Sequence, residues 1–340
     1  MTPHVSVPVS EPSQVGEVRR TAQRMAENAG LSEVESGNVA IVATELATNL
    51  SKYATDGRVL LQTLRRRSGV CIELLSIDSG PGMADVERCL RDGYSTSGSP
   101  GTGLGAARRL ASEFDVYSRP GEGSVVLARV STKCGAPVER GFQWAAVSSP
   151  APHELVCGDA WRVIERDGEI ALMVADGLGH GPLAAEAADR AGDVFDAAGF
   201  DEPGAICERV HRALNGSRGA AFAAAQVMQR AVVRYAGVGN IAGSVVSPVQ
   251  SRGMFSQNGT LGLHMRKTQQ LDYEWPERAL LIMHSDGVSN RWSLDAYEGL
   301  ISRHPAVVAA VLLRDFGRGR DDATVVVVRA ERRSVETDHV

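Results

Sequence analysis

Two stretches of the C-terminal half, Val156-Cys-Gly-Asp-Ala160 and Ala175-Asp-Gly-Leu-Gly-His-Gly181, decide the expected fold. Each places an aspartate beside a glycine at one end of an aliphatic run, and the pattern recurs in His284-Ser-Asp-Gly287 and Arg320-Asp-Asp-Ala-Thr324. Carboxylate oxygens at strand ends are the ligands that Mg²⁺ and Mn²⁺ prefer. The pattern therefore predicts a divalent-metal site at one edge of a sheet, formed by Asp159, Asp176, Asp286 and Asp321.

A single Asp-Gly pair at the end of a strand is common turn chemistry. Four such carboxylates at one sheet edge would repel each other without a cation, so a metal accounts for the set better. Two ions sharing one aspartate can activate water for in-line attack on phosphorus. We interpret His180 as an exposed residue of a glycine-rich loop rather than a general acid, and Gly237-Val-Gly-Asn240 as a tight turn rather than a site.

Length and composition limit the possible classes of protein. A chain of 340 residues favours two domains. The net charge of −5, with both signs mixed, gives no electrostatic case for nucleic acid. Five scattered cysteines without a CxxC pair fit a reducing compartment. The first residues do not form a signal peptide, and no apolar run reaches the length of a membrane span. We expect a cytoplasmic protein without a membrane or nucleic-acid partner.

In the N-terminal half, apolar spacing predicts helices over 15–29 and 32–54, and a further helix over 106–114. Four strands are expected in the same half, over 58–66, 70–78, 115–120 and 124–130, and residues 1–14 are expected to form either one edge strand or a loose arm. Glu45 and Asn49 stand at i and i+4, so both side chains leave one helix face and can share a magnesium ion or a water. Asp78 ends a strand and precedes two glycines. The loop 98–105 leads into a helix N-terminus, where free N–H groups favour phosphate.

Together these residues resemble the GHKL nucleotide-binding family. Thr44-Glu-Leu-Ala-Thr-Asn49 resembles its N box, Asp78-Ser-Gly-Pro-Gly-Met83 its first glycine box, and Gly101-Thr-Gly-Leu-Gly105 its second. The resemblance covers about residues 10–132 and implies that Asn49 holds Mg²⁺, Glu45 is the general base and Asp78 accepts the adenine amino group of ATP. It further implies that Gly80 and Gly82 shape the pocket, and that the phosphates are covered by Gly101, Thr102, Gly103, Leu104 and Gly105.

Within this family, the short lid is most similar to anti-sigma serine kinases of the RsbT and RsbW type and to switch kinases of the stressosome. The sequence has no phospho-acceptor histidine helix pair upstream, which argues against a histidine kinase. Kinases of this fold often dimerise, so the resemblance implies a possible homodimer. Lys52, just after the N box, has no assigned role.

A polar segment, residues 133–139, is the expected linker between domains 1–132 and 140–332, and 333–340 form a tail. The second domain reads as strands over 142–150, 155–165 and 169–177, with a hairpin signal at Asp167-Gly168. Helices are expected over 183–198, 204–215 and 306–315. Further strands are expected over 221–228, 230–240, 244–250, 279–287 and 323–330. We therefore predict an α+β fold in which two antiparallel sheets form a sandwich with flanking helices.

The second domain resembles metal-dependent Ser/Thr phosphatases of the PPM family, specifically their SpoIIE/RsbX-like branch, because its short motifs stand in the order of that family: CGD, ADGLGHG, SDG and DDAT. That resemblance implies an α-β-β-α sandwich after the GHKL α/β sandwich, and hydrolysis of phosphoserine or phosphothreonine with two Mn²⁺ or Mg²⁺ ions. It makes Asp159, Asp176, the Gly177 carbonyl, Asp286 and Asp321 the metal ligands, with Asp322 replacing or supporting Asp321. Arg140 is the candidate for binding the phosphate group of the substrate.

A kinase-like half and a phosphatase-like half suggest opposing actions on one target. The resemblance implies a phosphorylated STAS-domain protein, either an anti-sigma antagonist or a stressosome protein. Two alternatives stay open: a phosphatase regulated by a non-catalytic ATP sensor, and a nucleotide-gated module that binds a sigma regulator without chemistry.

Overall fold

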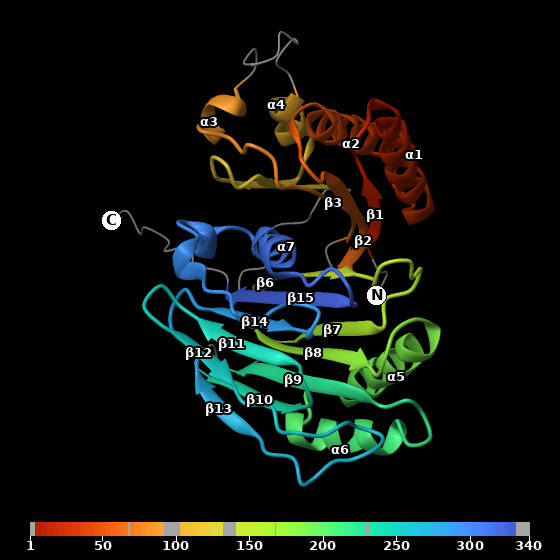
Figure 1. Ribbon diagram of the computed structural model, residues 1–340, viewed down its shortest axis with the longest axis vertical. Coiled ribbons are helices and arrows are strands. Elements are labelled where there is room, and N and C mark those ends of the chain that lie inside the picture. The colour runs from red at the N-terminus through yellow and green to blue at the C-terminus, as the bar shows by residue number, and fades with distance from the viewer. Residues whose placement is uncertain are drawn as a thin grey trace, which may run out of the picture. The chain divides into compact units, whose positions relative to one another are not determined.

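The computed structural model describes residues 4–66, 69–91, 103–131, 141–166, 168–228 and 232–330. Two compact units divide the chain. The first combines Thr2–Ala136 with Ser302–Arg314, and the second combines Pro137–Ile301 with Asp315–Val340. Both contain antiparallel sheets and helices, which confirms the expected α+β class (Figure 1). Among the helices of the described residues, none is long and apolar enough to cross a membrane.

The N-terminal unit is built on one five-stranded sheet with the order β1-β2-β3-β5-β4. Its strands are β1 (Val5–Pro8), β2 (Arg58–Arg66), β3 (Gly69–Asp78), β4 (Glu113–Ser118) and β5 (Ser124–Ser131). Its helices are α1 (Pro12–Ala29), α2 (Glu33–Tyr53), α3 (Val86–Cys89) and α4 (Gly103–Leu110). Helix α2 begins at a capping box in which Ser32 accepts from the Glu35 amide and Glu35 accepts from Ser32. Such a cap typically stabilises a helix by about 1 kcal/mol.

Both faces of this sheet are buried. One face carries Leu61, Leu74 and Ala128 into the core that α1, α2 and α4 also line. The opposite face carries a row of buried polar residues, because Gln62 pairs with Glu73 and Glu73 pairs with Arg129 across neighbouring strands. Strands buried on both faces read as near-continuous apolar runs, as β3 and β5 do.

The C-terminal unit is a sandwich of two five-stranded antiparallel sheets, ordered β13-β10-β9-β8-β7 and β12-β11-β14-β15-β6. The first sheet holds β7 (Asp159–Arg166), β8 (Glu169–Gly177), β9 (Ala220–Met228), β10 (Val232–Val238) and β13 (Leu271–Glu274). The second holds β6 (Phe142–Ser149), β11 (Ala242–Val246), β12 (Ser251–Met254), β14 (Leu280–His284) and β15 (Ala323–Ala330). The helices of this unit are α5 (Pro182–Ala198) and α6 (Pro203–Ala213). Helix α7 (Pro305–Phe316) follows in the sequence, but its residues up to Arg314 group with the N-terminal unit.

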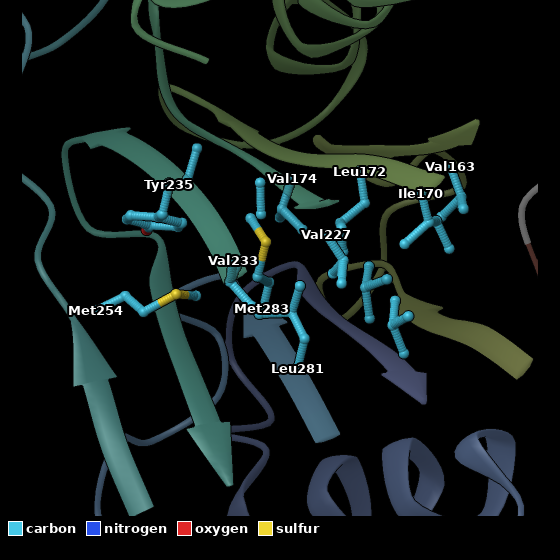
Figure 2. Packing of buried hydrophobic residues seen from close by; sticks show 14 of the residues in the cluster. Val163, Ile170, Leu172, Val174, Val227, Val233, Tyr235, Met254, Leu281 and Met283 are labelled. Carbon is cyan, nitrogen blue, oxygen red and sulfur yellow. The ribbon is translucent and has the colours of Figure 1, made fainter. Parts of the chain in front are cut away.

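Side chains from the two inner faces of the sandwich form its main core. Leu172 and Val233 come from one sheet and Leu281 and Met283 from the other, and all four are fully buried (Figure 2). A second core lies between β7–β10 and the helices α5 and α6. Each fully buried aliphatic side chain contributes roughly 1.5–3 kcal/mol. These cores fix the strand ends on which the aspartates sit.

Several expected element boundaries differ from the structure, and two of them have a clear cause. The strand expected from residue 155 begins only at Asp159, and Leu155 is 98% exposed in a loop. The helix expected over 106–114 ends at Leu110, because Glu113 pairs with Arg129 as the first residue of β4. Strands β12 and β13 were not expected, since both are short and mostly exposed.

Candidate metal and nucleotide sites

The two central aspartates of the C-terminal unit face each other across neighbouring strands. Asp159 begins β7 and Asp176 lies near the end of β8, where the two residues are register partners. Asp159 is buried, and its Oδ2 accepts a 2.6 Å hydrogen bond from Ser285 Oγ. The same Ser285 oxygen accepts from the Thr324 amide at 2.9 Å, so Ser285 joins Asp159 to the second sheet.

The other three carboxylates lie at the ends of β14 and β15. Asp286 follows β14, and its Oδ2 accepts a 2.7 Å hydrogen bond from Asn240 Nδ2. Asp321 and Asp322 precede β15; Asp321 is exposed, whereas Asp322 is buried and accepts from the Ala151 amide at 2.9 Å. Because β14 pairs with β15, these residues reach the same end of the sheet.

The electrostatics show that these carboxylates are neighbours. Burial first, then the charges of Asp159, Asp286, Asp321 and Asp322, raise the pKa of Asp176 to about 8. Burial also raises the pKa of Asp159 to about 7, with Asp322 and Asp286 contributing, although the bond from Ser285 opposes the rise. A cluster whose members resist joint ionisation calls for a compensating cation.

The donor set fits divalent ions. Asp159 Oδ1 and Asp322 Oδ2 are buried oxygens without a hydrogen-bond partner. Gly158 leaves space beside them, since a Cβ there would lie 2.6 Å from Asp322 Oδ2. Carboxylate oxygens with free lone pairs are the ligands that Mg²⁺ and Mn²⁺ require. Within the described ranges, no three His, Cys, Asp or Glu side chains are already arranged to hold a metal ion.

The loops beside the aspartates carry a polar pair and an apolar rim. His180 Nδ1 lies 2.6 Å from Glu154 Oε1, and the pair is accessible to solvent. Leu155, Leu178 and Leu183 are 98%, 49% and 54% exposed. Gly177 ends β8 as expected. Arg140 lies outside the described residues.

In the N-terminal unit, three of the expected nucleotide-site residues come together. Glu45 and Asn49 occupy one face of α2, and Gly103 begins α4. A Cβ at Gly103 would lie 3.1 Å from Glu45 Oε2 and 3.5 Å from Asn49 Oδ1. The carboxylate and the carboxamide therefore meet the start of α4, where free N–H groups favour phosphate oxygens.

The expected adenine-binding residues lie at the end of β3. Asp78 Oδ1 accepts a 2.8 Å hydrogen bond from the Gly80 amide, and Gly82 adopts the left-handed φ of +67°. Burial raises the pKa of Asp78, while the Gly80 bond and the Arg314 charge oppose the rise. Leu104 and Gly105 are in the first turn of α4. Gly101 and Thr102 lie outside the described part of the chain.

Comparison with known proteins gives a separate match for each unit. Residues 9–130 match the family described as histidine kinase-like ATPase domain, and residues 166–331 match stage II sporulation protein E (SpoIIE). The serine/threonine-protein kinase RsbT of Bacillus subtilis (strain 168) is 32% identical over 110 residues, which are 32% of this chain and 83% of RsbT. The phosphoserine phosphatase RsbX of the same strain is 27% identical over 136 residues, 39% of this chain and 68% of RsbX.

A solved structure described as "The bacterial stressosome: a modular system that has been adapted to control secondary messenger signaling" matches with a TM-score of 0.51 at 28% identity. The match covers 55% of this chain and 99% of the chain in that structure. The chain thus carries a histidine kinase-like ATPase domain of the GHKL type joined to a SpoIIE domain of the PPM phosphatase type. More narrowly, the chain belongs to the RsbT kinase family in its N-terminal part and carries a SpoIIE domain, similar to RsbX, in its C-terminal part.

Sequence reasoning missed two residues that orient the carboxylates. The stretch Gly237–Asn240 ends β10 in a bend, and Asn240 there donates a hydrogen bond to Asp286. Ser285, next to Asp286 in the sequence, was not assigned a role and binds Asp159. A serine beside a candidate ligand at a strand end is a signal that could have found it.

Proposed function

We propose that this protein is a bifunctional signalling switch. In this proposal the N-terminal unit phosphorylates a Ser or Thr of a STAS-type anti-sigma antagonist or stressosome protein, and the C-terminal unit removes that phosphate. The observation that carries the proposal is the presence, in one chain, of the Glu45–Asn49–Gly103 arrangement and of the aspartate cluster around Asp176. Similarity to RsbT and to RsbX, a kinase and a phosphatase, supports it.

In the kinase reaction, the chain supplies positions for nucleotide and acceptor. Asp78 would hold the adenine amino group, and the carboxamide of Asn49 would hold Mg²⁺. The first amides of α4 would bind phosphate oxygens through their free N–H groups. Glu45, which lies beside Gly103, would accept the proton of the substrate hydroxyl. Because phosphoryl transfer depends mainly on positioning and charge stabilisation, this small set is sufficient.

In the phosphatase reaction, Asp159, Asp176, Asp286 and Asp321 or Asp322 would hold two Mn²⁺ or Mg²⁺ ions. Held by these carboxylates, such ions would supply a water of lowered pKa and would offset phosphoryl charge. Ser285 fixes Asp159, and Asn240 fixes Asp286, so both carboxylates are oriented before substrate arrives. The exposed leucines around the site offer contact area that a folded protein substrate can use.

Purified protein incubated with labelled ATP, Mg²⁺ and a STAS-domain target tests this proposal. Label should move to the target and then return to solution as phosphate. Glu45→Ala should stop the first step only, and Asp176→Asn the second only. If Glu45→Ala transfers label at the wild-type rate, the N-terminal unit is not the kinase.

The sensor alternative has one specific observation in its favour, since a segment of the phosphatase half is built into the N-terminal unit. ATP binding without label transfer, combined with a changed phosphatase rate, would favour the sensor. If neither the kinase nor the phosphatase activity depends on Glu45 or Asp176, the result would favour the alternative of a nucleotide-gated binding module without chemistry.

A further inference from the structure

The N-terminal unit includes a segment that the C-terminal half supplies. Residues 302–314 belong to the unit formed by Thr2–Ala136, yet in the sequence they lie between Asp286 and Asp321. The chain therefore leaves the phosphatase unit after one candidate metal ligand and returns just before the next. Any displacement of this segment has to be taken up by the short connections on either side.

The start of the segment is held by the buried polar row of the sheet. His304 is buried; its amide donates to Asp115 Oδ2 at 2.7 Å, and its Nδ1 accepts from the Ala306 amide at 3.0 Å. Its Nε2 lies 3.3 Å from Glu113 Oε2, and Arg129 Nη1 bonds Glu113 at 2.7 Å. With Nδ1 as an acceptor, the ring is neutral and its Nε2–H can donate to Glu113.

From there, helix α7 follows β5 to the other end of the sheet. Ten residues separate His304 from Arg314, about 15 Å of helix. The distance along β5 from Arg129 to Ser124, the partner of Asp78, is about 17 Å. Arg314 accordingly reaches the end of β3, where its Nη1 donates to the carbonyl oxygen of Asp78 at 3.1 Å.

Directly after Arg314 the chain is tied to the loop of Asp286. The Phe316 carbonyl accepts from the Ser289 amide at 2.9 Å, and the Arg318 amide donates to the Gly287 carbonyl at 2.8 Å. Asp321 follows three residues later. One short stretch thus links the residue that bonds Asp78 to two loops that carry candidate metal ligands.

We propose that Arg314 is a positioning residue of the nucleotide site, and that through α7 it couples nucleotide binding at Asp78 to metal binding at Asp286 and Asp321. The inference rests on the proposed function of both sites. A nucleotide that fixes Asp78 also fixes Arg314 and the stretch behind it, so the loops of Asp286 and Asp321 become more ordered. Coupling of this kind is reciprocal, so metal binding strengthens nucleotide binding by the same factor.

The test compares wild type with Arg314→Gln, Arg314→Lys and Arg303→Gln. Arg303 serves as the matched control, because it is an arginine of the same segment that bonds Asp115 Oδ1 at 3.2 Å instead of Asp78. Three quantities are measured: affinity for a non-hydrolysable ATP analogue, hydrogen exchange of residues 286–289 and 316–322, and the Mg²⁺ dependence of p-nitrophenyl phosphate hydrolysis. The analogue is saturating at every Mg²⁺ concentration used.

In wild type and in Arg303→Gln, the analogue should slow exchange in both stretches and lower the Mg²⁺ concentration for half-maximal turnover about fivefold, the lower range of allosteric coupling. Arg314→Gln should bind the analogue about five- to tenfold more weakly and lose both responses at saturation. Arg314→Lys should partly restore them, since it keeps the charge but not the fork geometry.

Two results would overturn the inference while leaving the proposed function intact. One is a wild-type protein that binds the analogue and hydrolyses phosphate but shows no change in exchange or Mg²⁺ dependence. The other is an Arg314→Gln variant that responds as wild type does. A wild type that fails to bind the analogue, or fails to hydrolyse phosphate, refutes the proposed function itself and the coupling with it.

Discussion

Replacing Asp176 by asparagine should separate stability from activity in the phosphatase unit. Asp176 faces Asp159 across β7 and β8, and Asp286, Asp321 and Asp322 add to the negative field around it. In the metal-free protein these charges oppose one another inside a partly buried site. The substitution Asp176→Asn would keep the shape of the side chain and remove the cost of placing a carboxyl group in this buried, acidic site, so the metal-free variant should be more stable than wild type.

The size of the effect follows from the pKa of Asp176, which is raised from 3.8 to about 8. A carboxyl group with a raised folded pKa binds more protons in the folded state, so metal-free stability falls as pH rises from the ordinary value to the raised one. Each pKa unit corresponds to about 1.4 kcal/mol, which sets an upper limit of about 4 kcal/mol near pH 7. Allowing for solvent screening, we expect a gain of about 1–3 kcal/mol.

Thermal unfolding with and without a chelator measures this gain. Near neutral pH the metal-free variant should unfold about 3–8 °C above metal-free wild type, and the difference should shrink toward about pH 4. Added Mn²⁺ should raise the unfolding temperature of wild type much more than that of the variant, which should have no phosphatase turnover. A metal-free variant less stable than wild type, or equally stabilised by Mn²⁺, would refute the reasoning.

Three further predictions concern other parts of the chain. Burial raises the pKa of Glu73, but Arg129 and His4 outweigh burial and lower this pKa to about 2, so the stability from the Glu73–Arg129 pair should be present above about pH 4.5 and fall as pH drops toward 2. Glu73→Gln should lower the free energy of unfolding in urea by about 3–5 kcal/mol near neutral pH and flatten its acid dependence. Parallel pH profiles for wild type and the variant would contradict this prediction. Leu155→Ser, at a 98% exposed position, should raise KM for a phosphoprotein severalfold without changing p-nitrophenyl phosphate hydrolysis, and equal effects on both substrates would argue against a docking role. If His180, which lies beside Glu154, protonates the leaving serine oxygen, His180→Asn should lower kcat for a phosphoserine substrate at least about tenfold and leave kcat for p-nitrophenyl phosphate unchanged. An unchanged kcat for phosphoserine would show that His180 is only a loop residue.

The facing of Asp159 and Asp176 could be derived from the sequence. The turn signal Asp167-Gly168 lies midway between them, since Asp159 precedes Asp167 by eight residues and Asp176 follows Gly168 by eight. A two-residue hairpin makes such positions register partners, and the structure has them so. Local turn chemistry therefore accounts for the positions of two of the five carboxylates.

The convergence of Asp286 and Asp321 depends instead on long-range strand pairing. Many residues separate them, and only the pairing of β14 with β15 brings them to one sheet end. Their position at strand ends suggested that they join the cluster, but the pairing that brings them together could not be derived from the local sequence. The same limit applies to Asn240. Its turn could be predicted from the local sequence, but its hydrogen bond to Asp286 depends on the folded arrangement of distant strands.

The membership of residues 302–314 in the N-terminal unit could not be predicted. Val307–Leu313 is apolar on every helix face, which indicates a buried helix but not what buries it. The residues that hold the segment are Asp115, Glu113 and Asp78, which are far away in the sequence and look like ordinary strand residues.

The most direct measurement of the central claim is the position of bound ions in crystals soaked with Mn²⁺ and an ATP analogue. Anomalous scattering should show Mn²⁺ in contact with Asp176 and its neighbouring aspartates, and a further ion at Asn49 beside the nucleotide phosphates. Crystals in which the analogue occupies the N-terminal unit but no ion contacts Asp159, Asp176, Asp286 or Asp321 would contradict the account.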